Sequence, residues 1–259
     1  EDGIRARSPS RGLGDVYKRQ VPGGFSANAT EVEQEGLRLP PVKLVNQGKL
    51  VHDVVDIVYS NVRVPEERIG DLKAQLGALS IGEQRLTALL DKYGIDTVNA
   101  VIAEMKKRSA LLMRSNIEQI PDGQYQFSTF LDSDGIEEGL LEINVKANVT
   151  GSDISFDLTG SSPPCKGPMN SVWATTLGAV YCGMKHIFPD VPINSGCFQP
   201  IELIVPKGCL LNPLFPSAVV AGNVETSQAL CNLMFGALGI MAASQGTMNN
   251  LTFGDTNQQ

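Results

Sequence analysis

The chain has 259 residues, of which 42% are hydrophobic and 19% charged, so it can form a buried core and is not a fully disordered protein. Its net charge of −7 and pI of about 4.9 argue against nucleic-acid binding, which requires clustered Lys and Arg. The five cysteines form no short-spaced pair, and the sequence shows neither a membrane-length apolar run nor a signal-peptide core. We therefore expect a cytoplasmic protein with reduced thiols and no membrane contact.

Residues 1–20 (EDGIRARSPSRGLGDVYKRQ) are rich in Arg, Ser and Gly and lack apolar periodicity, which predicts a disordered or extraneous leader. The last part of this stretch resembles translated adapter sequence, so we exclude it from the fold prediction and expect the true start further upstream. The alternative is a basic arm for an anionic partner. We interpret residues 21–259 as one partial domain, helical over about 49–120, with a β meander and helices over about 121–259.

Between residues 21 and 48, proline pairs and glycines disfavour helix and predict loops with short strands. Glu31, Glu35 and Arg38 lie in this segment. Carboxylates beside an arginine suit a substrate or a metal, and we treat the three residues as substrate-binding candidates. A surface ion-pair cluster is the alternative.

Three helices are predicted next. Apolar residues recur at helical spacing over 50–58. Pro65, followed by two glutamates, marks the start of a long helix that should run to Tyr93 and end at Gly94.

Asp96 is predicted to cap the third helix. One face of this helix is apolar, which is typical of a core or a subunit interface rather than of a cofactor site. The residues of this stripe are Val98, Val101, Ile102, Met105 and Leu112.

After Pro121 the hydrophobic period changes to two. Alternating residues over 125–131, 141–149 and 154–158 predict three strands, and the turn at 150–153 carries a hairpin signal. The sequence therefore predicts an antiparallel meander.

A weakly charged helix over about 171–188 should be buried against a sheet or a partner. A strand is expected over 201–205 and a last helix from about 225 to 243, with Asn223 as its N-cap. The expected fold class is thus α+β, with a helical N-terminal half followed by an antiparallel β meander packed with helices.

Standard catalytic motifs are absent from the sequence: it contains no phosphate loop, dinucleotide fingerprint, nucleophile elbow or His-Glu-x-x-His motif. The only histidines are His52 and His186, so we predict no metal ligands in this chain. Four loops are instead dense in amides and hydroxyls, namely residues 168–170, 194–197, 222–228 and 244–250.

Amide and hydroxyl donors at a helix N-terminus suit a small polar ligand or a developing oxyanion. We take Asn170, Asn194 and Gly196 as substrate-binding candidates. The alternative is ordinary turn and cap chemistry. Cys197 is a possible nucleophile, although a buried structural thiol fits better without a histidine nearby in sequence. The catalytic candidates are Asn223, Glu225, Thr226 and Ser227.

Six ordered blocks stand out in the sequence: TEVEQEGLRLPP (30–41), NVRVPEERIGDL (61–72), DLTGSSPPCKGPMN (157–170), INSGCFQPI (193–201), GNVETSQ (222–228) and ASQGTMNN (243–250). Together these blocks resemble the hydantoinase B / 5-oxoprolinase family, and the resemblance covers essentially everything after residue 20.

The resemblance implies part of an ATP-dependent hydrolase that opens a cyclic amide such as 5-oxoproline or a hydantoin. It implies that a partner A-type subunit or domain binds ATP, while the B-type chain handles the activated intermediate. Family members are longer, so we expect an internal fragment that is inactive alone. A divalent metal would then be held by residues missing upstream. The alternatives are an ATP-dependent ketone carboxylase subunit and a non-catalytic structural partner of the A-type subunit.

Overall fold

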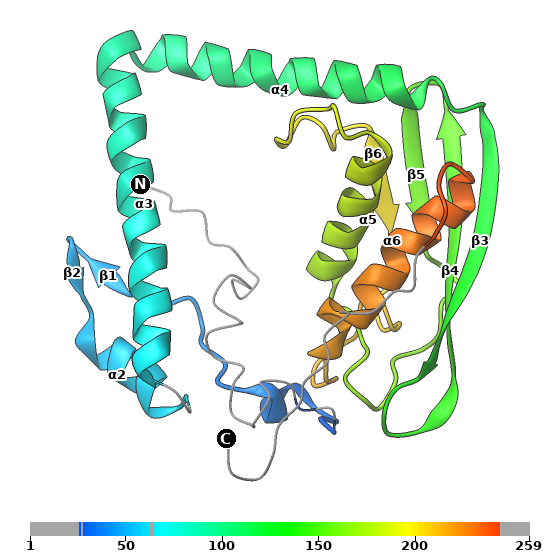
Figure 1. The fold of residues 1–259 in the computed structure, drawn as a ribbon, viewed down its shortest axis with the longest axis horizontal. Coiled ribbons are helices and arrows are strands. Elements are labelled where there is room, and N and C mark those ends of the chain that lie inside the picture. Colours follow the sequence, from blue (N-terminus) through cyan, green and yellow to red (C-terminus); the bar gives the residue numbers. More distant parts are fainter. Residues whose placement is uncertain (1–25, 27, 63–64, 244–259) are drawn as a thin grey trace.

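The computed structural model describes residues 26, 28–62 and 65–243, and its architecture is α+β, as expected (Figure 1). Residues 52–62 and 65–117 form a helical arm, and residues 118–243 form a body in which two helices pack on one sheet. The arm and the body enclose an open space, so the described chain resembles a frame in Figure 1.

Three helices, all expected from the sequence, make up the arm: α2 (His52–Ser60), α3 (Pro65–Tyr93) and α4 (Ile95–Ile117). Gly94 separates the last two because its φ of 79° lies in the left-handed region that glycine tolerates best. Gly94 is also the N-cap of α4, so the predicted cap at Asp96 is wrong. Asp96 lies in the first helical turn instead, where its charge favours the positive end of the helix dipole.

The segment before the arm contains a short 3-10 helix, η2 (Val32–Glu35), which the proline-based prediction of loops and strands missed. A small hairpin of β1 (Val45–Asn46) and β2 (Lys49–Leu50) follows it, turning through Gln47 and Gly48 with positive φ. This hairpin leads directly into α2.

The main sheet contains the predicted meander: β3 (Gly123–Ser133), β4 (Glu138–Thr150) and β5 (Asp153–Asp157) are successive antiparallel neighbours. The expected fourth strand, β6 (Ile201–Ile204), pairs with β5 in parallel, which the sequence pattern did not indicate. Parallel neighbours require a long crossover, and α5 (Trp173–Ile187) supplies it.

The core of the body lies on one face of this sheet. Alternate residues of β4, from Ile143 to Val149, are almost fully buried, as a half-buried strand requires. Figure 1 shows α6 (Glu225–Leu238) against the sheet and α5 beside α6. Gly183 allows the two helices to approach closely, since a Cβ there would lie 3.2 Å from the Met234 side chain.

Both ends of α6 differ from the sequence prediction. The helix ends at Leu238 rather than near residue 243, because Gly239 adopts the left-handed conformation (φ 63°) that terminates helices. The predicted N-cap at Asn223 is wrong, since Val224 holds the N-cap position and Asn223 ends the 3-10 turn η3 (Ala221–Asn223).

The apolar stripe of α4 is not part of this chain's core. Met105 is 57% exposed and Val101 52%, whereas Met113 and Ile117 pack into the core of the body. No helix in the described part of the chain is long and apolar enough to cross a membrane.

Candidate functional site

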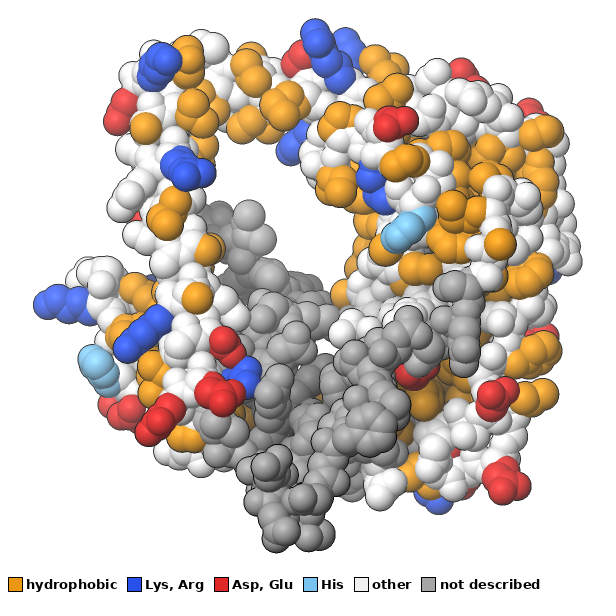
Figure 2. Space-filling model, in the orientation of Figure 1, with side chains coloured by type: hydrophobic (Ala, Val, Ile, Leu, Met, Phe, Trp, Pro, Cys, Tyr) orange, Lys and Arg blue, Asp and Glu red, His pale blue; other side chains and the backbone are white. Residues whose placement is uncertain are grey.

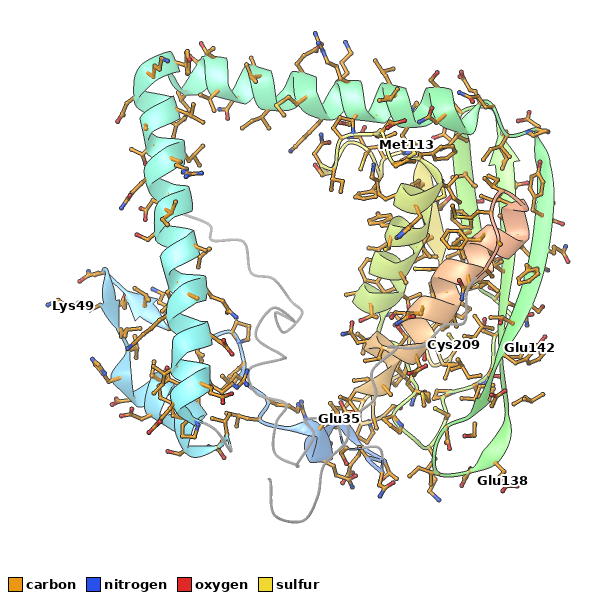
Figure 3. The ribbon with its side chains drawn as sticks, viewed as in Figure 1. Glu35, Lys49, Met113, Glu138, Glu142 and Cys209 are labelled. Carbon is orange, nitrogen blue, oxygen red and sulfur yellow. The ribbon has the colours of Figure 1, made fainter. Side chains whose placement is uncertain are left out.

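Most of the candidate residues gather around one connecting segment, residues 215–227, which leads from the sheet into α6. Two other stretches contact this segment: residues 30–38, which contain η2, and residues 165–170. Figure 3 shows Glu35 at this meeting point, at the foot of α6. We refer to this region as the α6 entrance.

Glu35 fixes the N-terminal segment to the α6 entrance. Its side chain is buried, and its Oε1 accepts hydrogen bonds from the backbone amides of Val219 (2.5 Å) and Val220 (2.7 Å). Charge-assisted bonds of this type are about twice as strong as neutral ones. Glu35 therefore has a structural role in the described chain.

The other two candidates of this stretch lie at the surface of the α6 entrance. Glu31 forms a backbone bridge with Ser217. Arg38 pairs with Glu33 at 2.6 Å, and its guanidinium lies 4.7 Å from the ring centroid of Phe215. An exposed Arg and a carboxylate remain available to a ligand, so their proposed substrate role stays a prediction.

Asn170 is fully buried, and backbone groups occupy its amide. Its Oδ1 accepts from the Cys165 amide (2.9 Å), while its Nδ2 donates to the carbonyls of Cys165 (3.0 Å), Gly167 (3.0 Å) and Ala218 (2.9 Å). Thr226 is also buried and donates its hydroxyl to Met169 O at 2.5 Å. Both side chains hold the 165–170 loop against the α6 entrance, which leaves little capacity for a ligand.

The first turn of α6 is the part of the α6 entrance best suited to bind or react with a ligand. Its N-cap residue Val224 supplies no side-chain hydrogen bond, so the first amides of the helix point out without a cap from that residue. Asn223 is exposed and Glu225 half-buried, and neither side chain bonds to another described residue. Ser227 donates its hydroxyl to Asn223 O at 2.9 Å and retains acceptor capacity.

Asn194 and Gly196 lie apart from the α6 entrance, in the loop that follows α5 beneath α4 (Figure 1). Asn194 donates to Ser109 Oγ at 2.7 Å and accepts from the Gly196 amide at 2.8 Å. A Cβ on Gly196 would lie 2.0 Å from Lys106 O, so only glycine fits against α4 there. The loop therefore joins body and arm, and the structure does not bring these two residues together with the others.

Asp134, which no sequence motif singled out, contacts the 165–170 loop that packs against the α6 entrance. The side chain is buried and accepts from the amides of Ile136, Glu137 and Gly167 at 2.6–2.8 Å. Burial alone would raise the pKa of this carboxyl, but those backbone hydrogen bonds outweigh burial and hold the pKa below its ordinary value. In the sequence, Asp134 is followed by Gly135 and resembles an ordinary turn residue. This local pattern does not predict the contact with Gly167, which is 33 residues away.

The cysteines differ in access and acidity. Burial, with a smaller contribution from Asp134, raises the pKa of the Cys165 thiol to about 11, and burial raises that of Cys231 to about 12. Cys197 is fully buried and donates to Asn194 O, which fits the structural interpretation. Cys182 is exposed, 3.6 Å from Nδ1 of His186 one turn along α5.

Among the described residues, no group of three or more His, Cys, Asp or Glu side chains could hold a metal ion. The polar loop at 244–250 lies outside the described residues, and the metal ligands that the family resemblance implies would belong to residues upstream of this sequence.

The fold and the α6 entrance thus define a class: an α+β protein with a helix N-terminus whose N-cap residue makes no side-chain hydrogen bond and which has amide, carboxylate and hydroxyl side chains in or beside its first turn. Residues 19–259 match the Hydantoinase B/oxoprolinase family, and the chain belongs to it.

Two curated relatives illustrate the family. The chain is 36% identical over 230 residues to the B-type subunit of a putative D-/L-hydantoinase from Pseudomonas sp., covering 84% of this chain and 39% of the relative. It is 33% identical over 239 residues to the 5-oxoprolinase of Dictyostelium discoideum, covering 91% of this chain and 19% of that protein. The chain therefore spans less than half the length of these relatives.

Two solved structures have the same fold. The ATP-dependent caprolactamase from Pseudomonas jessenii superposes with a TM-score of 0.77 at 32% identity, over 86% of this chain and 38% of that chain. A nucleotide-free acetone carboxylase superposes with a TM-score of 0.78 over 86% of this chain and 31% of that chain. Since its identity is only 15%, this second match shows the fold alone.

Proposed function

We propose that the chain is part of the B-type subunit of an ATP-dependent hydrolase that opens a cyclic amide. Relatives that carry the names 5-oxoprolinase, hydantoinase and caprolactamase support the reaction class, because each name denotes a cyclic amide or ureide substrate. The observation that carries the proposal is the uncapped first turn of α6, with Asn223, Glu225 and Ser227 beside it.

The chemistry explains why such a site is useful. An unstrained cyclic amide resists water because resonance stabilises the C–N bond. ATP, bound by the A-type subunit or domain, would supply the phosphoryl group that activates the amide oxygen. The activated species carries negative charge, which the positive end of a helix stabilises.

The residues of this chain would then bind and orient the activated intermediate. The α6 amides would hold its oxygen, and Asn223 and Ser227 would direct it by hydrogen bonds. Glu225 would accept a proton from the attacking water, since its carboxylate lies in the same first turn. Glu31 and Arg38 lie at the surface of the α6 entrance, where they would contact the substrate's polar substituents.

The test is co-expression of the whole B-type subunit with its A-type partner, followed by ATP hydrolysis assays with 5-oxoproline, a hydantoin, caprolactam, and acetone plus bicarbonate. Turnover with a cyclic amide is expected, and turnover only with acetone plus bicarbonate would assign the chain to the ketone carboxylases. Glu225→Gln and Asn223→Ala should each lower kcat at least tenfold, a loss of about 1.4 kcal/mol in transition-state stabilisation.

The matched control is Glu202→Gln, which removes an exposed carboxylate of β6 away from the α6 entrance. Wild-type turnover in the control, together with loss in the two α6 variants, would support the proposal. If the α6 variants retained full turnover of every substrate, the chain would instead be a structural partner of the A-type subunit.

A further inference from the structure

The contact between α5 and α6 brings two cysteines together. Cys231 of α6 is half-buried, and its Sγ donates to Ala179 O of α5 at 3.3 Å. The two backbones are close here, since a Cβ on Gly183 would lie 3.7 Å from the Cys231 Cα. Cys231 therefore packs against the turn of α5 from residue 179 to residue 183, and Cys182 belongs to this turn. Figure 2 shows the body from the side on which α5 and α6 lie, with hydrophobic side chains, the class that includes cysteine, gathered over both helices.

The two thiols are neighbours with different surroundings. Cys182 is exposed, and its thiol lies within hydrogen-bonding reach of the Cys231 thiol. Burial, and after it the neighbouring Cys182 thiol, raises the pKa of Cys231 to about 12. Cys182 can therefore meet a dissolved oxidant, whereas Cys231 stays protonated and reacts only with a group that is already beside it.

The other three cysteines are held within their own loops. Each thiol donates to a backbone carbonyl two or three residues away, at 3.1 to 3.3 Å. The pairs are Cys165 with Gly167 O, Cys197 with Asn194 O and Cys209 with Pro206 O. Among the described residues, the contact of α5 with α6 is therefore the place where thiols of two different elements meet.

We propose that Cys182 and Cys231 form an oxidation site, in which a hydroperoxide reacts at Cys182 and Cys231 then closes a disulfide that joins α5 to α6. In the first step the sulfur of Cys182 attacks the peroxide and the O–O bond breaks. The thiol hydrogen leaves with the departing oxygen as water, or as an alcohol if the peroxide is organic, and Cys182 becomes a sulfenic acid.

In the second step the sulfur of Cys231 attacks the sulfenic sulfur and the S–O bond breaks. The hydroxyl group and the hydrogen of Cys231 leave together as water. The two thiols thus lose two electrons, which the peroxide gains. Groups that a fold holds in contact react as if at a very high concentration, which compensates for the raised pKa of Cys231. In a protein with otherwise reduced thiols, such a bond is typically transient and senses oxidants.

The test is hydrogen peroxide treatment of the reduced 259-residue chain, followed by blocking of the remaining thiols and mass spectrometry of unreduced peptides. The peptides of Cys182 and Cys231 should be linked, and the number of free thiols should fall from five to three. A linkage through any other cysteine would overturn the proposal, as would a sulfinic acid at Cys182 with Cys231 still free. A covalent dimer through Cys182 on a non-reducing gel would overturn it too.

Serine variants separate the roles of the two thiols. Cys231→Ser should lose the linkage and retain a sulfenic acid at Cys182, which dimedone traps. Cys182→Ser should lose both the linkage and the dimedone adduct, because Cys231 is shielded. The matched control is Cys165→Ser, which removes another thiol of raised pKa and should leave the linkage yield unchanged. Oxidation of Cys231 in Cys182→Ser at the wild-type rate would contradict the order of the two steps.

Thermal unfolding tests whether the pair already faces in the native structure. The bond closes a loop of about fifty residues and restricts the unfolded chain, so the melting temperature should rise by roughly 5 to 10 °C. Reduction with dithiothreitol should reverse the rise, and peroxide-treated Cys231→Ser should not show it. A lower melting temperature of the oxidised wild type would mean that the bond distorts the helix packing, and the proposed native pair would be wrong.

Discussion

Replacing Asn170 by aspartate tests whether its amide holds the α6 entrance together or binds substrate. Asn170→Asp hardly changes shape but removes the Nδ2 group that donates to the carbonyls of Cys165, Gly167 and Ala218. The Nδ2 group has two hydrogens, and each lost bond costs about 1 kcal/mol. The new carboxylate also has no exposure and faces three carbonyl oxygens, which adds a penalty for unpaired burial.

Together these terms destabilise the variant by about 3 to 5 kcal/mol at pH 7. For a chain of this size the melting temperature should fall by roughly 10 °C. The assay is thermal unfolding followed by circular dichroism, with Asn223→Asp as the control. Asn223 is exposed and its side chain bonds to no other described residue, so the control should melt within about 2 °C of the wild type.

A melting temperature of Asn170→Asp equal to that of the control would refute the structural assignment. If the same variant, in the whole enzyme, then raised KM for the cyclic amide, the prediction of substrate contact by Asn170 would be correct instead.

Three further outcomes follow from the same geometry. Asp134→Asn should destabilise the chain at neutral pH and progressively less as the pH falls below about 4. The pKa of this carboxyl is lowered in the folded state, so the carboxylate stabilises the fold at pH values above the pKa of the unfolded state. Urea titrations at several pH values measure this effect, and a stability difference that does not change with pH would contradict it. Gly222→Ala should destabilise the chain strongly, because the added Cβ would lie 2.0 Å from Asn170 O. Its control is Gly178→Ala in α5, where an added Cβ meets nothing within 4 Å and should stabilise the helix by about 0.5 to 1 kcal/mol. Equal melting temperatures of the two variants would disprove the close approach at Gly222. Brief alkylation of the native protein near pH 7.5 should modify the exposed Cys182 first. Cys197 is buried, and the thiols of Cys165 and Cys231 have pKa values raised to about 11 and about 12, so all three should react later. Early labelling of Cys231 in peptide mass spectra would contradict this order.

Local sequence patterns predict most helices and strands of the fold, but they do not predict how these elements are arranged. The boundaries of α3 follow from Pro65 and Gly94, and the meander follows from period-two alternation, because these signals act within a few residues. The parallel placement of β6 beside β5 depends on the α5 crossover, which no short pattern encodes.

The candidate site shows the same limit. The sequence indicated which polar residues could act, but it could not show which side chains point inward. Asn170 is buried and donates to a carbonyl far along the chain, whereas Asn223, also an asparagine, is exposed. Likewise, the hydroxyl of buried Thr226 donates to the distant Met169 carbonyl, whereas the next residue, Ser227, is half-buried. The contact between Glu35 and the α6 entrance joins positions 184 residues apart, and only the tertiary structure reveals it.

That same contact determines how the arm is attached mechanically. Through α4 the arm continues directly into the body, and through Glu35 its other end is also fastened to the body, so the helices α2 to α4 are held at two points. A segment attached at one end can reorient relative to the body, whereas attachment at both ends restricts this motion. Closing so long a loop is entropically costly, and we expect this second attachment to form last in folding and to be lost first on mild destabilisation. The orientation of α3 therefore depends on a carboxylate far from it in the molecule.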